Sequence, residues 1–502
     1  MRTTWWQRGV IYQIYPRSFA DASGDGIGDL AGMRRHLDHL SWLGVDGLWT
    51  SPIYPSPMAD FGYDISNYTD IDPVFGSLDD FDALVEAAHR RDLRVLLDWV
   101  PNHTSDRHPW FMASRGSRSN PYRDWYIWRD QPNNWRRAFA DASAWTLDQR
   151  TGQYYLHHFL PQQPDLNWNN PAVRSAMHDV LRFWLDRGVD GFRADVVHLI
   201  GKNPELPDDP PDHPGDRVRT HRDQLTHEWL RGIRKVLDGY DGDRMMVGEV
   251  NLYEPADILS HAGADQLHMV FNFGLLRSPW SADAFRDEIA AIEHHAQRTA
   301  TWPTLVLSNH DEPRHRTRYG GDERRARVAA VVLLTLRGTP FLYAGEELGL
   351  EDAHVPADRV VDPGGRDPCR APIPWTAEPG HGWGDNAWLP LPPDPETRNV
   401  ATQRRDPHSI ANLYRRLLRA RRADPALHSG GLALLDAPAG VLAYDRIGPD
   451  GWRRVLANFG DAAVHVEDCT GLPVVVGTDR SGERAPFSGE LSPVTAVVLS
   501  DG

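Results

Sequence analysis

Residues 189–196 read VDGFRADV, a short run of β-branched and aromatic residues that ends close to an arginine and an aspartate. The segment before it, PAVRSAMHDVLRFWLDRG at 171–188, repeats its apolar residues at a helical spacing of about 3.6. Similar runs, most of them separated by helix-length segments, recur along the chain: VIYQIYP (10–16), VDGLWTSP (45–52), RVLLDWVP (94–101), RMMVGEV (244–250), QLHMVFNF (266–273), TLVLSNHD (304–311) and TPFLYAGE (339–346). Eight strand–helix units in series predict an α/β fold, a parallel (β/α)8 barrel of the TIM type.

Two parts of the chain depart from this alternation. The connection at 104–170 follows the third run and is rich in Trp, Tyr, Asn and Pro, so we expect a small inserted domain at the barrel mouth. From 431 to 502 short alternating strands replace the helices, which predicts a C-terminal antiparallel β domain. The barrel is then expected at 1–103 and 171–430.

The composition excludes several classes of protein. The 502 residues carry 54 Lys and Arg against 70 Asp and Glu, a formal charge of −16, which argues against a nucleic-acid partner because phosphate binding needs a basic face. No signal-peptide pattern and no apolar run long enough for a bilayer is found, so we expect a soluble cytoplasmic protein without a membrane partner. With only Cys369 and Cys469, a disulfide framework is excluded. The sequence sets no oligomeric state.

Polar side chains stand at the C-terminal ends of the predicted strands, where (β/α)8 barrels carry their active sites. The fourth strand ends in Arg193 and Asp195, the fifth in Glu249, and the seventh in His310 and Asp311. Any one of these carboxylates could be a strand-end cap or a salt-bridge partner, but three at one mouth are costly to bury unless function uses them. Two carboxyl groups about 5 Å apart, one ionised and one protonated, are the arrangement for retaining glycoside hydrolysis.

Tryptophan is unusually frequent, with 19 Trp beside 15 Tyr and 15 Phe, which is more indole than core packing requires. Indole faces pack against sugar rings. We therefore expect some of these residues to line a sugar pocket, in particular Trp49, Trp99 and Trp168, which lie in or beside the strand-end motifs.

The segments GFRADV, VGEV, SNHDE and DWVPNH resemble the four conserved regions of the α-amylase family, glycoside hydrolase family 13. QPDLNW at 163–168 is similar to the fifth region in the form typical of the oligo-1,6-glucosidase subfamily, which includes α-glucosidases. The opening WWQRGVIYQIYPRSFADASGDGIGDL and NVATQRRDPHSI near the end also resemble that subfamily, so the likeness covers nearly the whole chain. It implies an exo-acting retaining α-glucosidase that takes small α-glucosides, with possible transglucosylation.

The resemblance implies a role for individual residues. Asp195 would be the nucleophile, Glu249 the general acid and base, and Asp311 the stabiliser of the transition state. Arg398 would pair with Asp60 and close the pocket at the non-reducing 4-hydroxyl of the terminal glucose. The substrate-binding residues implied in this way are Asp60, Tyr63, His103, Arg193, His310 and Arg398.

An acidic loop at 21–29, Asp-x-Ser-x-Asp-Gly-Ile-Gly-Asp, places oxygen-bearing side chains at alternating positions around a glycine turn. It differs from an EF-hand because position 12 is Gly32 and no helix precedes it, and a solvated acidic turn is the alternative. The family resemblance implies a structural Ca2+ site there, with serine where asparagine is usual. The implied ligands are Asp21, Ser23, Asp25, the Ile27 carbonyl and Asp29.

The sequence leaves open which α-glucosidic linkage the enzyme cuts. Val196 follows the predicted nucleophile, and in this subfamily valine there accompanies activity on α-1,6 links, as in an oligo-1,6-glucosidase (isomaltase). In contrast, 201–214 and 388–393 resemble α-glucosidases with a broad linkage range. A sucrose-isomerising or glucosyl-transferring relative is a further alternative, although EPRHRTRYGGDE at 312–323 does not match the RLDRD-like loop of sucrose isomerases. A binding protein without activity is disfavoured because all three carboxylates are present.

Overall fold

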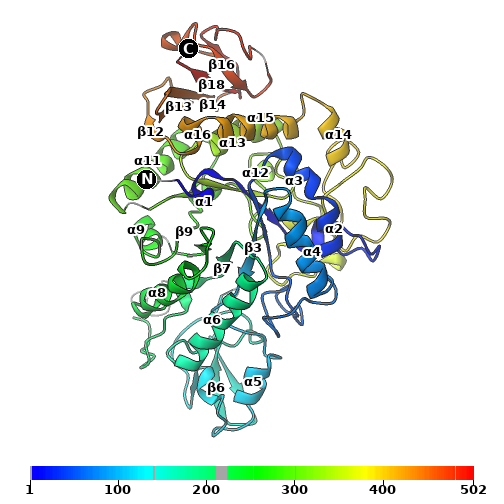
Figure 1. The fold of residues 1–502 in the computed structure, drawn as a ribbon, viewed down its shortest axis with the longest axis vertical. Helices are drawn as coiled ribbons and strands as arrows, with labels where there is room; N and C mark the ends of the chain where they lie inside the picture. The colour runs from blue at the N-terminus through cyan, green and yellow to red at the C-terminus, as the bar shows by residue number, and fades with distance from the viewer. Residues whose placement is uncertain are drawn as a thin grey trace.

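The structure, a computed structural model, describes residues 3–138, 142–210, 223–252, 254–299, 301–480 and 482–501. At its centre lies an eight-stranded parallel sheet in the order β10-β11-β1-β2-β3-β7-β8-β9 (Figure 1). The end strands approach one another through Thr304, whose hydroxyl donates to the Val270 carbonyl and accepts from the Asn272 amide. The sheet is therefore a nearly closed barrel. Its strands are β1 (Ile11–Ile14), β2 (Gly47–Thr50), β3 (Arg94–Trp99), β7 (Gly191–Ala194), β8 (Met245–Gly248), β9 (Met269–Val270), β10 (Thr304–Val306) and β11 (Thr339–Tyr343).

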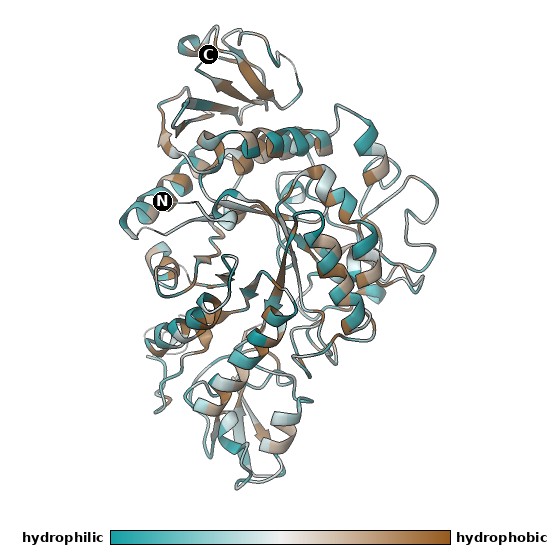
Figure 2. Cartoon of the chain, in the orientation of Figure 1, coloured by the Kyte–Doolittle hydropathy of each residue, from teal (hydrophilic) through white to brown (hydrophobic). Residues whose placement is uncertain are grey.

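The barrel strands read as hydrophobic runs because helices cover the outer face of the sheet and side chains fill its interior. Residues that alternate along a strand belong to different hydrophobic clusters, as the two faces of a sheet require. Ile11 and Leu96 pack in one cluster, whereas their neighbours Tyr12 and Leu97 pack in the larger cluster beneath the helices. Figure 2 shows the hydrophobic colouring of β3 in the middle of the molecule.

The helices begin at residues that satisfy their free amide groups. Ser77 and Asp80 form a capping box at the start of α4, and Asn170 caps α6, whose first residue is a proline. The longer helices are α4 (Leu78–His89), α6 (Pro171–Asp186), α8 (Leu225–Asp238), α11 (Ala282–Thr299), α13 (Glu323–Thr335) and α15 (Ile410–Ala423). The shorter ones are α1 (Trp5–Arg8), α2 (Leu30–Arg35), α3 (Leu37–Leu43), α5 (Pro109–Ser114), α9 (Pro255–Leu259), α10 (Gly274–Arg277), α12 (His315–Arg318), α14 (Val400–Arg405) and α16 (Pro425–His428).

The connection between β3 and α6 folds as a separate small unit, at the lower end of the molecule in Figure 1. It contains a three-stranded antiparallel sheet in the order β4-β6-β5. Its last part returns to the barrel, where Asp165 pairs with His103 in an isolated antiparallel bridge. The strands are β4 (Trp128–Arg129), β5 (Trp145–Asp148) and β6 (Gln153–Leu156).

The C-terminal part is an antiparallel sheet in the order β12-β13-β14-β18-β16. It is joined to the barrel by Arg446 on β13, whose buried guanidinium donates to carbonyls near the ends of α13 and α16. The predicted fold class, a barrel with an insertion after the third strand and a C-terminal β domain, is confirmed. No helix among the described residues combines the length and apolarity that crossing a membrane needs. The strands are β12 (Gly431–Leu434), β13 (Val441–Gly448), β14 (Gly451–Asn458), β16 (Val474–Gly477) and β18 (Ala496–Ser500), with β15 (Val464–His465) and β17 (Glu490–Leu491) in a separate pair.

Candidate active site

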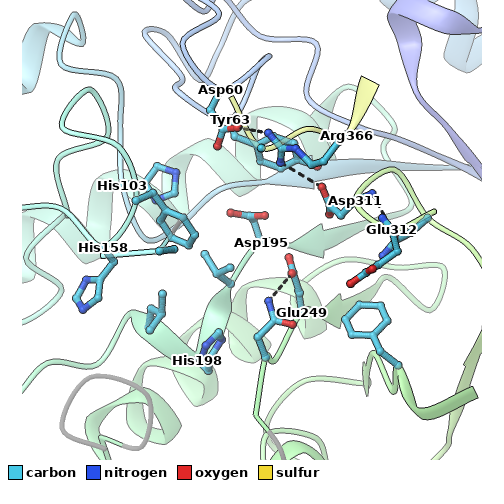
Figure 3. Close-up of a pocket in the computed structure, with 18 of the residues that line it drawn as sticks. Asp60, Tyr63, His103, His158, Asp195, His198, Glu249, Asp311, Glu312 and Arg366 are labelled. Atoms are coloured by element: carbon cyan, nitrogen blue, oxygen red, sulfur yellow. Dashed lines mark hydrogen bonds and ion pairs between the residues drawn. The ribbon is translucent and has the colours of Figure 1, made fainter. Parts of the chain in front are cut away.

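A cavity of about 350 Å³ lies beyond the C-terminal ends of the barrel strands, which is the size of a small-molecule site. The three predicted catalytic carboxyl groups reach it from different strands: one follows β7, one follows β8 and one lies five residues beyond β10 (Figure 3). Six of the nine residues predicted to act on substrate line it: Asp60, Tyr63, His103, Asp195, Glu249 and Asp311.

Arg193 connects the carboxyl groups on one side of the cavity. One terminal nitrogen, Nη1, donates to Asp98 Oδ1 at 2.8 Å and to Asp195 Oδ1 at 2.6 Å. The other, Nη2, donates to Glu249 Oε2. These contacts arise because β7 lies between β3 and β8, so that Asp98, Arg193 and Val247 are in register. A single guanidinium thus brings Asp195 and Glu249 side by side.

The charges of this group are not independent. Burial raises the pKa of Asp195, the Arg193 guanidinium opposes this effect, and the neighbouring carboxylates of Glu249 and Asp98 raise the pKa again. Burial raises the pKa of Asp98 to about 6, although Arg193 stabilises its ionised form. Three carboxyl groups therefore share one positive charge, and the cluster tends to hold a proton. A retaining glycosidase needs such a shared arrangement, with one carboxyl ionised and its neighbour protonated.

Tyr63 lines the cavity and is paired with His310, which is not among the described residues that line it. The Tyr63 hydroxyl lies 2.6 Å from His310 Nε2 and donates to Asp98 Oδ2 at 3.1 Å. Gln13 on β1 contacts His310 Nδ1 at 2.7 Å, so the imidazole is held at both nitrogens. Burial lowers the pKa of His310 to about 3, and the ring is neutral at pH 7. His310 therefore holds the Tyr63 hydroxyl at the cavity without adding a charge.

Asp60 and Asp311 are joined across the far side of the cavity by Arg366. Arg366 Nη2 lies 2.6 Å from Asp60 Oδ1, and Nη1 lies 3.2 Å from Asp311 Oδ1 (Figure 3). Arg370 adds a second contact to Asp311 at 3.1 Å. Although burial opposes ionisation, these arginines hold the pKa of Asp311 well below its usual range. Asp311 is consequently ionised at pH 7.

The prediction that Arg398 pairs with Asp60 was wrong. Arg398 Nη1 donates to Glu323 Oε2 at 2.8 Å, and Arg398 does not line the cavity. The physical reason is the path of the long connection from β11 to α14. Its middle passes over the barrel mouth and brings Arg366 to Asp60, whereas its end has already reached the N-cap of α14 beside α13.

The inserted domain supplies a residue that the sequence analysis missed. Gln163 Nε2 donates to Asp60 Oδ2 at 3.0 Å and lies 3.1 Å from His103 Nε2. Gln163 belongs to the QPDLNW segment, so the motif points to this region but does not by itself assign a contact to this side chain. Burial lowers the pKa of His103 to about 4, which leaves it neutral at pH 7. The insertion thereby fixes both Asp60 and His103 at the cavity.

Asn251, Arg366 and Arg370 were also missed. Asn251 Nδ2 donates to Glu249 Oε1 at 2.7 Å from two residues further along the chain, a spacing that could have drawn attention. Both arginines belong to the segment VDPGGRDPCR at 361–370, which also contains Asp362 and Asp367. Only their spacing within a turn-forming sequence could have suggested them, because no strand leads into this segment.

Val196 lies at the cavity directly after Asp195, and its backbone is left-handed, with φ of 33° and ψ of 42°. A β-branched residue in this region is strained, at a cost of about 1–3 kcal/mol. Strain of this kind persists only where the surroundings impose it, here through the Val197 amide that donates to the Glu249 carbonyl. The turn thus ties the segment after Asp195 to the strand end that carries Glu249.

The expectation that tryptophans line the pocket was wrong. Trp49, Trp99 and Trp168 are all buried, and none of the described residues lining the cavity is a tryptophan. Trp49 instead donates its indole N–H to Asp98 at 3.3 Å, beneath the site. The aromatic side chains at the cavity are Tyr63, Phe159 and Phe273.

The loop at 21–29 is closed by its own hydrogen bonds. Asp21 accepts from the amides of Gly24 and Gly26, and Asp29 Oδ2 accepts from the amides of Ala22 and Ser23. Nowhere in the described part of the chain do three or more His, Cys, Asp or Glu side chains form a group that could hold a metal ion. The carboxylates of this loop therefore do not converge on one point, and calcium at 21–29 stays a prediction.

The two carboxyl groups that one arginine holds side by side at the mouth of this (β/α)8 barrel fit the carboxyl pair that a retaining glycoside hydrolase uses. The family model for the alpha amylase catalytic domain matches residues 13–430. The chain is similar to a probable alpha-glucosidase of Rhizobium meliloti (strain 1021), with 41% identity over 88% of this chain and 87% of that protein. It is also similar to an oligo-1,6-glucosidase of Parageobacillus thermoglucosidasius, with 37% identity over 92% of this chain and 91% of that protein.

Among solved structures, an isomaltulose synthase mutant from Erwinia rhapontici NX5 in complex with its natural substrate sucrose is 33% identical. The structural match covers 100% of this chain and 99% of the isomaltulose synthase chain, with a TM-score of 0.93. The chain belongs to the α-amylase family, glycoside hydrolase family 13, in the subfamily of α-glucosidases and oligo-1,6-glucosidases. It is a retaining glycoside hydrolase that acts on α-glucosides by hydrolysis or glucosyl transfer.

Proposed function

We propose that this protein is an exo-acting α-glucosidase that removes terminal non-reducing glucose from disaccharides and short oligosaccharides. The observation that carries the proposal is the Asp60–Arg366–Asp311 chain of ion pairs, which spans the side of the cavity opposite Glu249 (Figure 3). A sugar that enters past Glu249 meets charged groups there, and these suit the hydroxyl groups of a chain end. A longer glucan would need this side to be open.

In the proposed reaction Asp195 attacks the anomeric carbon while Glu249 gives its proton to the leaving oxygen, so the glycosidic bond breaks as the Asp195 ester forms. Glu249, now ionised, takes a proton from water, whose oxygen displaces Asp195 and releases glucose. Asn251 and Arg193 hold the Glu249 carboxyl from two sides. The ionised Asp311 balances the positive charge that develops on the sugar ring and grips its hydroxyls.

Transfer follows from the same intermediate when a sugar hydroxyl replaces water as the acceptor. Activity restricted to α-1,6 links is the second candidate, since Val196 lies at the cavity and one similar protein is an oligo-1,6-glucosidase. A sucrose-isomerising or transferring enzyme is the third, since an isomaltulose synthase shares the fold closely. Hydrolysis is preferred because the segment at 312–323 differs from the loop of sucrose isomerases.

The experiment is a product analysis on α-linked glucose disaccharides, sucrose and starch. The proposal expects glucose from the disaccharides, retention of the α configuration, and no rapid fall in starch viscosity. Asp195→Ala should retain the fold and less than about 1% of the activity, since the covalent step has no other nucleophile. Isomaltulose as the main product from sucrose, or a rapid loss of starch viscosity, would contradict the proposal.

A further inference from the structure

The arginine that closes the cavity is itself held by a tight turn. The turn is formed by Asp362, Pro363, Gly364, Gly365 and Arg366, and the Gly365 amide donates to the Asp362 carbonyl at 3.1 Å. Gly365 has a φ of 74°, which a residue with a side chain rarely adopts. The Arg366 amide then donates to Asp362 Oδ2 at 2.8 Å. The turn therefore brings the first and last side chains of the segment together.

Asp362 holds one edge of the Arg366 guanidinium. Arg366 Nε donates to Asp362 Oδ2 at 3.0 Å, and Nη2 donates to Oδ1 at 2.6 Å. This fork geometry is the strong form of an arginine–carboxylate pair. While Asp362 accepts from Nε and Nη2 of Arg366, Nη2 also donates to Asp60 and Nη1 donates to Asp311. The orientation of the guanidinium in the cavity thus depends on Asp362.

Asp362 is suited to this role because its own position is fixed. Its side chain is buried, and its backbone amide donates to Asp367 Oδ2 at 3.1 Å. Burial alone would raise the pKa of Asp362, but the Arg366 pair outweighs burial and the pKa lies below its usual value. Arg370 Nη1 approaches the same carboxylate at 3.4 Å. Asp362 therefore remains an anion between two arginines.

Gly364 leaves the space that the ion pair needs. A Cβ atom at this position would lie 2.9 Å from Arg366 Nε and 3.1 Å from Asp362 Oδ2. Both distances are shorter than ordinary contacts of a methyl group. Any side chain at 364 would therefore push the two charged groups apart, although the residue itself is exposed to solvent.

We propose that Asp362 is a positioning residue that aims Arg366 at the terminal glucose and so sets the preference for a free 4-hydroxyl. The proposal rests on the proposed exo-acting α-glucosidase and names the part of the chain that makes the pocket exo-specific. Asp362 acts only through Arg366, because it does not line the cavity. This positioning requires the spacing Asp-x-Gly-Gly-Arg, in which the first glycine leaves space for the ion pair and the second turns the chain.

The test compares two substrates, 4-nitrophenyl α-glucoside and its 4-deoxy analogue. Asp362→Asn keeps the shape of the side chain but removes the charge that orients Arg366. We expect kcat/KM for the glucoside to fall about 10- to 100-fold, mainly through KM, because a charge-assisted contact to the 4-hydroxyl is weakened. The 4-deoxy analogue lacks that hydroxyl, so its kcat/KM should change by less than about threefold. A general structural defect would instead lower kcat/KM for both substrates by the same factor.

Gly364→Ala should shift the ratio of the two substrates in the same direction, because its methyl group separates Asp362 from Arg366. It is the second variant if Asp362→Asn fails to fold, which thermal melting would reveal. Asp358→Asn is the matched control, since Asp358 is an exposed aspartate of the same loop. An unchanged ratio in both variants, or an equal loss on both substrates, would overturn the role of Asp362. A wild-type enzyme that releases no glucose from any α-glucoside would overturn the proposed function as well.

Discussion

Single substitutions of Arg366 and Arg398 test which arginine serves the substrate. The sequence predicts Arg398, whereas the fold places Arg366 at the cavity. Arg366→Ala removes the ion pairs to Asp60 and Asp311. The Asp60 carboxylate then keeps the hydrogen bond from Gln163 but loses its ion pair, so its pKa, already raised by burial, should rise further. Arg398→Ala breaks a pair with Glu323 outside the cavity and should leave the sugar contacts intact.

The size of the effect follows from these contacts. A hydrogen bond to a charged group contributes about 1.5–3 kcal/mol, and about 1.4 kcal/mol corresponds to a tenfold change in rate. Arg366→Ala should therefore lower kcat/KM for glucose release from maltose about 10- to 100-fold. Breaking a buried ion pair also costs about 3–5 kcal/mol of stability, so the melting temperature should fall. Arg398→Ala should change kcat/KM by no more than about twofold.

The assay is the initial rate of glucose release over a range of maltose concentrations, at a temperature at which all variants are folded. Arg366→Lys is a useful third variant, because it keeps the charge but cannot contact Asp60, Asp311 and Asp362 with one planar group. Equal losses in Arg366→Ala and Arg398→Ala would refute the reasoning. So would an Arg366→Ala enzyme with wild-type kcat/KM.

Three further predictions concern stability and specificity. Burial raises the pKa of Glu346 to about 8, whereas the unfolded chain releases this proton near 4.5, so the folded state loses stability between those pH values, on the order of 5 kcal/mol in total. Glu346→Gln should reduce this loss, so the melting temperature of the variant minus that of the wild type should be larger at pH 8 than at pH 5. The same difference at both pH values would contradict a buried Glu346 carboxyl with a raised pKa. If the loop at 21–29 binds calcium, chelation should lower the melting temperature by a few degrees and Ca2+ should restore it; no shift would refute the site. Val196→Thr keeps the branched side chain in its strained turn, so a shift from isomaltose towards maltose would identify this residue as the selector, and an unchanged ratio of the two rates would exclude it.

The barrel could be predicted because its signal is local. Each strand is a short hydrophobic run and each helix repeats its apolar residues at 3.6-residue spacing, so the alternation is legible without tertiary contacts. The carboxyl groups were found for a related reason: in parallel strands all C-terminal ends meet at one mouth. Asp195 and Glu249 directly follow their strands, and their meeting follows from topology alone.

Residues in long connections could not be placed in this way. Arg366 and Asp60 are 306 positions apart in sequence, and both stand in loops whose paths no periodic pattern describes. Arg398 and Arg366 are equally plausible partners for Asp60 on charge alone. The prediction that tryptophans line the pocket failed for a different reason, because packing decides whether an aromatic side chain faces a cavity or the core. Trp99 and Trp168 pack edge to face with each other beneath the site.

The amino-acid pattern alone therefore determined the barrel, the position of the insertion and the three carboxyl groups at the strand ends, since these depend on periodicity and strand order. The tertiary structure decided which arginine closes the cavity, that Gln163 connects the insertion to Asp60, and that Asp362 aims Arg366. These contacts join loops whose ends are fixed by the barrel but whose course depends on packing and charge pairing between distant segments. Such pairing exists only once the chain has folded.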